Sequence, residues 1–206
     1  MQVRYLAIGF SILVFSCGLF ETEDENNNSQ VYDYYLEDIN NLSSTYGQII
    51  SPVFFQGNVT LHYFGSQQWE ICTARVGQLN TLYQDLLNQN IKNVQIIAIG
   101  IDQKSSFNTN WTDDNTIPVV IDISTKDTWT NWGASQWDLF FLDTNGNYVE
   151  DFNIKIWDYD KIYNSIMNII SGSTDSGYNN YNPDDTIDDG SCTLVLENTR
   201  ILTNST

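Results

Sequence analysis

Residues 59–87 read VTLHYFGSQQWEICTARVGQLNTLYQDLL, and this stretch decides the fold. Residues 59–64 alternate in the manner of a β-strand, and the Gly-Ser-Gln-Gln run at 65–68 breaks the pattern. From Cys72 onward, apolar side chains recur at helical spacing with polar residues between them. We therefore expect a strand over 59–64, a turn, and a helix over 69–90. A thiol in the first turn of a helix lies at the positive end of the helix dipole, which favours the thiolate.

The segments after this stretch predict a mixed sheet. Residues 94–100 are continuously apolar, which is typical of a strand buried on both faces, so strand, helix and strand form a right-handed βαβ unit. Further strands are expected over 117–122, 139–142 and 148–152, with the last two joined by a hairpin turn at Asn145-Gly146. Asp158 is expected to cap a final helix that runs to residue 170.

The remaining segments are less regular. A helix is expected over 125–133, and a loose helix or long loop over 102–115. Near the N-terminus we expect a short helix over 31–41 and an edge strand over 49–55, where Pro52 suits an edge position. This order of elements predicts an α/β sandwich with helices on both faces of a mixed sheet.

Charge and cysteine usage exclude several functions. The net charge is −18, from 26 acidic and 8 basic residues, which argues against binding to nucleic acid or to an anionic membrane surface. The three cysteines, Cys17, Cys72 and Cys192, form no Cys-x-x-Cys pair. The single histidine, His62, lies inside a strand pattern, so we expect a packed core residue and neither a zinc ligand nor a triad member.

The N-terminus resembles a bacterial lipoprotein signal. Arg4 precedes an apolar stretch over 6–15 that is too short for a confident membrane span, and the stretch ends at Ser16-Cys17. Cys17 would then carry the lipid, although Phe15 is bulkier than usual for such a signal. An ordinary signal peptide or an uncleaved anchor is the alternative. We divide the chain into a signal over 1–17, an acidic tether and short helix over 18–48, a folded domain over 49–171 and a tail over 172–206.

Four motifs within the domain resemble the thioredoxin-like superfamily, and most closely the N-terminal domain of selenoprotein P. They are Trp-Glu-Ile-Cys at 69–72, Ile-Pro-Val at 117–119, Asp-Thr-Trp-Thr at 127–130 and Leu-Phe-Phe-Leu-Asp at 139–143. The resemblance implies a thioredoxin-like sandwich and thiol-redox or antioxidant chemistry. It also implies that position 69 is that of the nucleophile and that Cys72 is the resolving thiol.

This chain departs from that pattern at two points. Trp69 replaces the nucleophile, and no proline stands near Gln136 and Trp137, where many relatives carry a cis-proline. The relatives have selenocysteine, encoded by UGA, and some translation tables read UGA as tryptophan. If codon 69 is UGA, this residue is selenocysteine in the cell. Glu70 and the acidic chain oppose the effect of the helix dipole on Cys72, so we expect no strongly activated thiolate.

The C-terminal tail carries a second resemblance. Residues 180–192 are similar to a repeat seen in exported proteins of marine bacteria, in which a preceding cysteine pairs with the last one. Here that preceding position is Ser173, so Cys192 is left either free or paired with Cys72. A weak Ca²⁺ site is one interpretation of this acidic segment; the spacing fails the EF-hand pattern, and a solvated acidic turn is the simpler interpretation. Its ligands would be Asp184, Asp185, Asp188 and Asp189.

Two functions compete. In the first, the chain is an extracytoplasmic, lipid-anchored protein of the bacterial cell envelope that exchanges electrons with a protein or peptide thiol or disulfide, or with a peroxide, through Cys72. In the second, it is a catalytically inactive thioredoxin-fold module that binds a peptide or protein, with Trp69, Glu70 and Trp137 in its groove. A Ca²⁺-dependent adhesion role rests on the tail alone. No cofactor is expected apart from weakly held Ca²⁺ in the tail.

Overall fold

A five-stranded mixed sheet forms the centre of the protein. The computed structural model describes residues 31–102, 104–122 and 127–171. The sheet has the order β5-β4-β3-β6-β7, with β3 (Val59–Gly65) in the middle. β3 is parallel to β4 (Val94–Gly100) and antiparallel to β6 (Asp138–Leu142). At the edges, β5 (Val119–Ile121) runs parallel to β4, and β7 (Tyr148–Asn153) forms a hairpin with β6.

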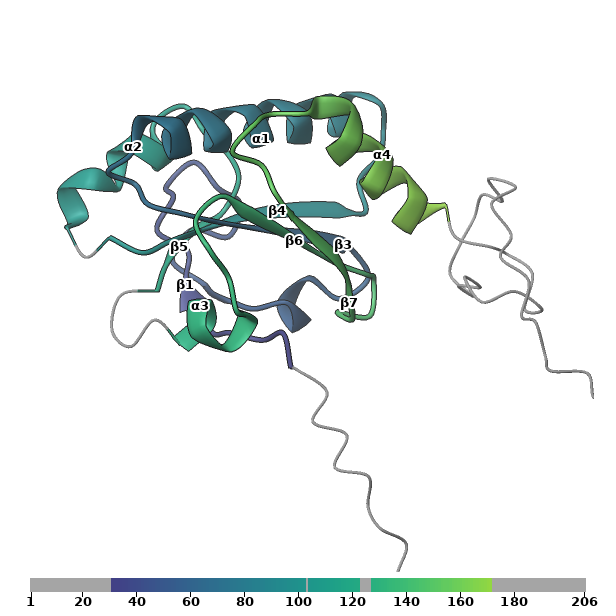
Figure 1. Cartoon of the computed structure of the whole chain (residues 1–206), viewed down its shortest axis with the longest axis horizontal. Helices are drawn as coiled ribbons and strands as arrows, with labels where there is room; N and C mark the ends of the chain where they lie inside the picture. The colour runs from purple at the N-terminus through teal and green to yellow at the C-terminus, as the bar shows by residue number, and fades with distance from the viewer. Residues whose placement is uncertain (1–30, 103, 123–126, 172–206) are drawn as a thin grey trace, which may run out of the picture.

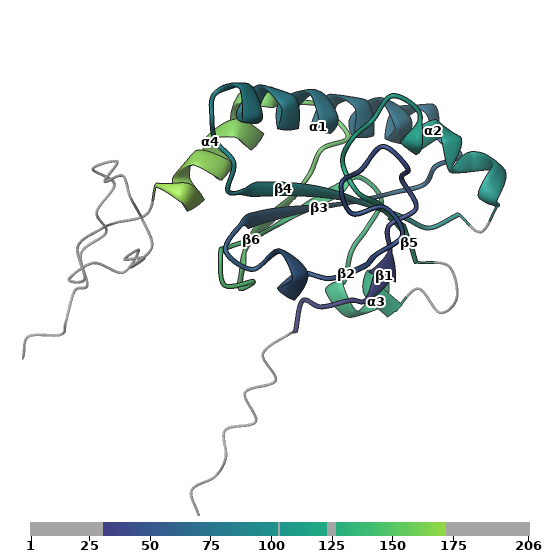
Figure 2. The same ribbon diagram turned by 180° about the vertical axis from the view of Figure 1, so that it is seen from behind.

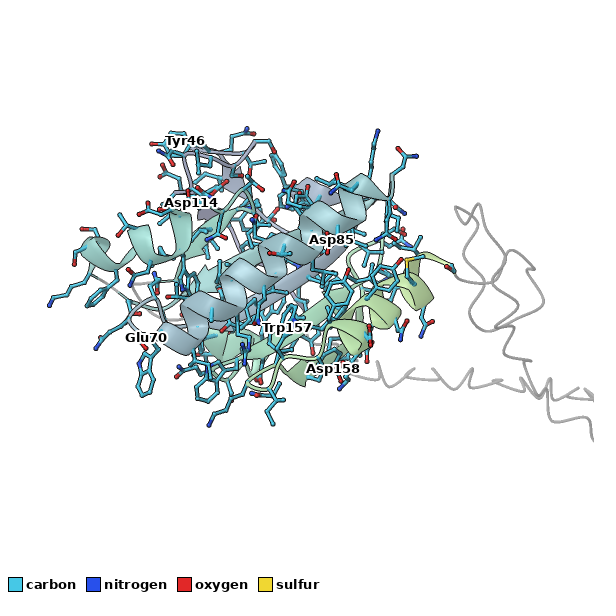
Figure 3. All side chains as sticks on the ribbon, turned by 90° about the horizontal axis from the view of Figure 1, so that it is seen from above. Tyr46, Glu70, Asp85, Asp114, Trp157 and Asp158 are labelled. Carbon is cyan, nitrogen blue, oxygen red and sulfur yellow. The ribbon has the colours of Figure 1, made fainter. Side chains whose placement is uncertain are left out.

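Helices cover both faces of this sheet (Figures 1 and 2). On one face lie α1 (Glu70–Asn88), α4 (Tyr159–Ile170) and the single turn α2 (Thr109–Thr112), which follows the 3-10 turn η2 (Ser105–Phe107). α1 and α4 run side by side in the view from above (Figure 3). The other face carries α3 (Asp127–Trp132) and the N-terminal segment. The mixed sheet and the two-sided helical cover confirm the predicted fold class.

Alternation along β3 divides the interior into two cores. Val59, Leu61 and Tyr63 point toward α1, whereas Phe64 belongs to the core on the α3 side. All seven residues of β3 are buried, because the strand has a paired neighbour on each edge and a packed layer on each face. The core on the α3 side is rich in aromatic residues: Tyr34, Phe55, Phe64, Trp129, Trp132 and Phe140.

The short helix expected over 31–41 does not form. Instead, β1 (Leu36–Glu37) pairs with β2 (Ile49–Ile50) in a separate two-stranded sheet. The cause is the fully buried carboxylate of Asp38, which accepts hydrogen bonds from the backbone N–H groups of Asn40 (2.9 Å) and Val119 (3.0 Å). It also accepts one from the hydroxyl of Thr45 (2.7 Å). Asp and Asn side chains compete in this way with helical hydrogen bonds.

The edge strand expected over 49–55 is also shorter than predicted. The strand ends at Ile50, and Pro52 begins the 3-10 turn η1 (Val53–Phe55), because proline has no N–H to continue a ladder. The region expected to be a loose helix or loop forms η2 and α2. No helix within the described ranges is both long and apolar enough to cross a membrane.

His62 is a packed residue of the central strand, as predicted. The Nδ1 atom lies 3.2 Å from the hydroxyl oxygen of Tyr34, and Nε2 lies 2.9 Å from that of Thr60. The edge of Trp132 packs against the imidazole, with ring centroids 4.9 Å apart. Burial lowers the pKa of His62 to about 3, so the ring is neutral at physiological pH.

Replacing Asp38 with alanine should strongly destabilise the fold. The change leaves two buried N–H groups and a buried hydroxyl without their acceptor, so we expect a loss of about 3 kcal/mol in the free energy of unfolding. Urea unfolding at neutral pH measures it. Asp113→Ala, at an exposed position, is the matched control and should change stability by less than about 0.5 kcal/mol. Equal effects of the two substitutions would contradict this role for Asp38.

His62 should make the free energy of unfolding depend on pH at values above those at which ordinary carboxylates titrate. Its pKa is about 3 when folded and 6.5 for the free side chain, so the unfolded chain binds the extra proton first. Stability is therefore complete above pH 6.5 and falls as the pH drops toward 3. Between pH 7 and pH 5 we expect a loss of about 2 kcal/mol. Chemical unfolding at the two pH values measures it, and a His62→Gln variant should lose most of this dependence.

Candidate functional site

The candidate site lies in the loop between β3 and α1, at the carboxyl ends of two parallel strands. Asp102, which follows β4 by two residues, accepts hydrogen bonds from the hydroxyl of Ser66 (2.7 Å) and the backbone N–H of Gln68 (3.1 Å). The N–H of Asp102 in turn donates to the side-chain oxygen of Gln67 (3.0 Å). These bonds fix the loop that leads into α1.

Gln67 is fully buried and crosses directly over Gly100. A Cβ atom at position 100 would lie 2.5 Å from the amide of Gln67, which is closer than real contacts allow. The carbonyl of Gln67 accepts a hydrogen bond from the side chain of Asn110 (2.7 Å). The glycine at the end of β4 therefore provides the space that lets the β3–α1 loop dock onto its neighbour.

Trp69 stands at the N-cap of α1. Its backbone is extended, with φ −99° and ψ 124°, and its carbonyl accepts hydrogen bonds from the N–H groups of Cys72 (2.9 Å) and Thr73 (3.1 Å). An indole offers no acceptor, and within the described chain no side chain caps this helix start. The residue is 55% exposed. The first turn of α1 thus presents a bare aromatic side chain to solvent.

A shallow hollow lies beside Trp69 at the start of α1, and this hollow is part of the polar surface. Glu70 is exposed in the first helical turn, and Figure 3 shows its position at this end of α1. The hollow is lined by Gln68, Glu70, Thr73, Ala74 and Asn110.

Cys72 is fully buried in the first turn of α1 and is the one cysteine among the described residues. The side-chain amide of Gln136 donates a hydrogen bond to its sulfur at 3.3 Å. Gln136 precedes β6, so the contact joins two segments that are 64 residues apart in the chain.

Tyr63 also neighbours the thiol. Burial raises the pKa of Tyr63, and the neighbouring Cys72 raises it further, while Arg75 acts in the opposite direction. Arg75 is held in place by the carbonyl of Ile154, to which its Nε donates at 2.6 Å, and by the carbonyl of Lys155.

The segment before β6 has an unusual backbone. Trp137 adopts φ +74°, a value uncommon for a residue with a side chain. Its N–H donates to the carbonyl of Phe64 (2.8 Å), and its own carbonyl accepts from Ile154 (2.8 Å). The ammonium of Lys155 lies 4.6 Å from the centroid of the indole. None of the peptide bonds in the described ranges is cis, and Gln136, which has no proline neighbour, provides the contact to the thiol.

The predicted site residues therefore differ in their exposure to solvent. Trp69 and Glu70 are exposed at the start of α1, Cys72 lies beneath them in the core, and Trp137 is half-buried. Cys17, Cys192 and the aspartates proposed to bind calcium lie outside the described residues. Within those residues, no cluster of His, Cys, Asp and Glu could hold a metal ion.

Sequence reasoning missed the role of two residues of this site, Tyr63 and Gln136. Strand alternation does place Tyr63 on the face that carries α1, which is a usable signal. Gln136 comes from an irregular segment, so no periodicity indicates its direction.

The arrangement matches solved structures of one fold. No protein-family model and no curated protein sequence matches the chain. A thioredoxin-like protein from Bacteroides vulgatus superposes with a TM-score of 0.50 at 20% identity, covering 67% of this chain and 86% of that one. The chain has a thioredoxin-like fold.

Two further structures agree with this assignment. The thiol:disulfide interchange protein DsbE from Chlorobium tepidum matches with a TM-score of 0.52 at 16% identity, covering 66% of this chain and 95% of that one. BsSco, a member of the Sco family of cytochrome c oxidase assembly proteins, matches with a TM-score of 0.53 at 16% identity, covering 68% and 92%. At such identities the likeness concerns the thioredoxin-like fold alone.

Replacing Trp69 with serine should stabilise the protein. A serine hydroxyl at the N-cap can accept a hydrogen bond from a free N–H group of the first turn, which the indole leaves without a side-chain acceptor. We expect a gain of about 1 kcal/mol in the free energy of unfolding, measured by urea denaturation. Trp69→Ala, which cannot cap, is the control. A loss of stability in both variants would mean that the indole contributes to packing after all.

Proposed function

We propose that the chain is a lipid-anchored, extracytoplasmic thioredoxin-fold protein of the thiol-redox class, and that Cys72 is its reactive group. The observation that supports this most directly is the polar surrounding of the buried sulfur. A structural cysteine behaves as a small apolar core residue. Cys72 instead accepts a hydrogen bond from Gln136 and lies beside the hydroxyl of Tyr63. Solved structures with the same fold include thiol:disulfide interchange proteins.

In the proposed cycle, Cys72 loses two electrons to an oxidant and forms a bond from its sulfur to sulfur or oxygen. The thiol proton passes to the leaving group of the oxidant. An external protein or peptide dithiol then returns the two electrons, leaves as a disulfide and restores the thiol. Because Trp69 cannot attack a disulfide, the site is degenerate and Cys72 acts without an internal partner at position 69. A selenocysteine at position 69 would supply that partner.

The envelope location rests on the sequence. The Ser16-Cys17 end of the apolar N-terminal stretch favours lipid attachment at Cys17, and the acidic residues that follow suit a tether. We propose no resident cofactor. The aspartates at 184, 185, 188 and 189 remain candidates for weak Ca²⁺ binding. Loss of partner binding on addition of a chelator would support such a site.

A second candidate function is a binding module without turnover. Trp69 favours it, because an aromatic residue that is 55% exposed and does not cap its helix is a suitable anchor for a peptide or protein partner. The hollow beside it, lined in part by Glu70 and Asn110, would receive polar groups of that partner. This function needs no reactive thiol.

Site-resolved labelling of the thiols in the native chain separates the two functions. We expect Cys72 to be modified by a small disulfide reagent in the folded protein and to be recovered as a free thiol after a dithiol is added. Peptide mass spectrometry reads Cys72, Cys192 and the mass of residue 69 together. Cys72→Ser is the control. If Cys72 reacts only after denaturation and residue 69 has the mass of tryptophan, the redox function is wrong and the binding module stands.

A further inference from the structure

Two positive charges meet at the loop between β7 and α4, and neither has a carboxylate partner within the part of the chain that the structure describes. Arg75 on α1 donates hydrogen bonds to the carbonyls of Ile154 (2.6 Å) and Lys155. A further bond runs from its guanidinium to the side-chain oxygen of Gln78 (2.7 Å). All three acceptors are neutral, so they hold the guanidinium in place and leave its charge uncompensated. The ammonium of Lys155 lies over the indole of Trp137, 4.6 Å from the ring centroid.

Two uncompensated cations side by side are unexpected in so acidic a chain, which has 26 acidic residues against 8 basic ones. The carboxylates that border the loop are engaged elsewhere. Asp158 caps α4 by accepting from a backbone N–H (3.0 Å). Asp138, which pairs with Asn153 across the β6–β7 ladder, accepts from a backbone N–H before β6 (2.8 Å) and from the side chain of Asn153 (2.9 Å). The two positive charges are therefore open to an anionic group from outside the domain.

The same loop holds an apolar side chain out in solvent. Ile156 is 85% exposed, although the residues on both sides of it are fixed. Ile154 is buried, and its N–H donates to the carbonyl of Trp137 (2.8 Å). Trp157 packs against the core on the α1 side. A loop that is already ordered loses little conformational entropy on binding, so Ile156 is a preorganised apolar anchor for a partner.

This surface adjoins the candidate site. Arg75 lies three residues after Cys72 on α1, and its charge acts on the pKa of Tyr63. Trp137, under the ammonium of the loop, follows directly on Gln136, whose amide donates to the sulfur of Cys72. A partner that docks on the two cations therefore lies next to the start of α1.

We propose that the surface formed by Arg75, Trp137, Lys155 and Ile156 docks an extended acidic segment of a partner protein. Carboxylates of that segment lie beside the two cations, and an apolar side chain between them packs on Ile156. The rest of this strongly acidic chain repels such a segment, so the two cations also fix where it docks. The inference rests on the proposed function, because it names the chemistry of the partner that the candidate site receives.

The test titrates the folded chain with two short peptides and follows the NMR amide signals of the loop between β7 and α4. One peptide has the core Asp-Leu-Asp and the other has Asn-Leu-Asn, so the two differ only in charge. We expect the acidic peptide to bind about tenfold more tightly at low salt. The preference should shrink in about 0.5 M salt, because salt screens contacts between exposed charges. Lys155→Glu should abolish it, whereas Lys92→Glu, the same change at an exposed position beyond the other end of α1, should leave it unchanged.

Equal affinity for the two peptides, or equal effects of the two substitutions, would overturn the inference. So would a shift of the loop signals, without peptide, when the four aspartates at 184, 185, 188 and 189 are replaced by asparagine, because the tail of this chain would then be the occupant. If Cys72 reacts in the native chain but the peptides bind equally, this inference fails and the redox function stands. If the acidic peptide is preferred and Cys72 reacts only after denaturation, the redox function fails and this inference holds for the binding module.

Discussion

The ladder of main-chain hydrogen bonds on both edges of β3 is the constraint on which the rest of the molecule depends. β3 pairs in parallel with β4 over seven residues and antiparallel with β6 over four. This strand has no free edge, so its alternation alone decides which side chains enter each core. Its carboxyl end also fixes the origin of α1. The position of that strand end therefore sets the positions of the Trp69 backbone and of the buried Cys72 sulfur.

The sequence predicted those parts of the fold that depend on local pattern. The buried runs over 59–64 and 94–100, the hairpin at Asn145-Gly146 and the cap at Asp158 were readable, and the structure confirms each of them. The structure of the N-terminal segment could not be predicted from local sequence pattern. Its shape depends on Asp38, whose carboxylate accepts from Val119, 81 residues away. No local window contains that contact, and the pattern over 31–41 was therefore mistaken for a helix.

The same limit applies to the site. Cys72 and position 69 follow from one short motif, so the sequence alone indicates them. The surroundings of the thiol are assembled from β3 and the turn before β6, through Tyr63 and Gln136. Whether a buried cysteine lies among methyl groups or among donors is a property of the assembled core. The polar neighbours of Cys72 are therefore visible only in the assembled fold.

The contact between Gln67 and Gly100 ties the evolution of two positions to each other. Because the amide at the end of the Gln67 side chain occupies the volume of a Cβ atom at position 100, an alanine there requires that amide to move. Moving the amide would release the side-chain bond to the N–H of Asp102 that holds the loop before α1. Among homologues, we expect glycine at 100 to co-vary with a long amide at 67, and the pair to be exchanged together. The path between the two states passes through an intermediate in which the loop before α1 is loosened, which makes single steps along it unfavourable.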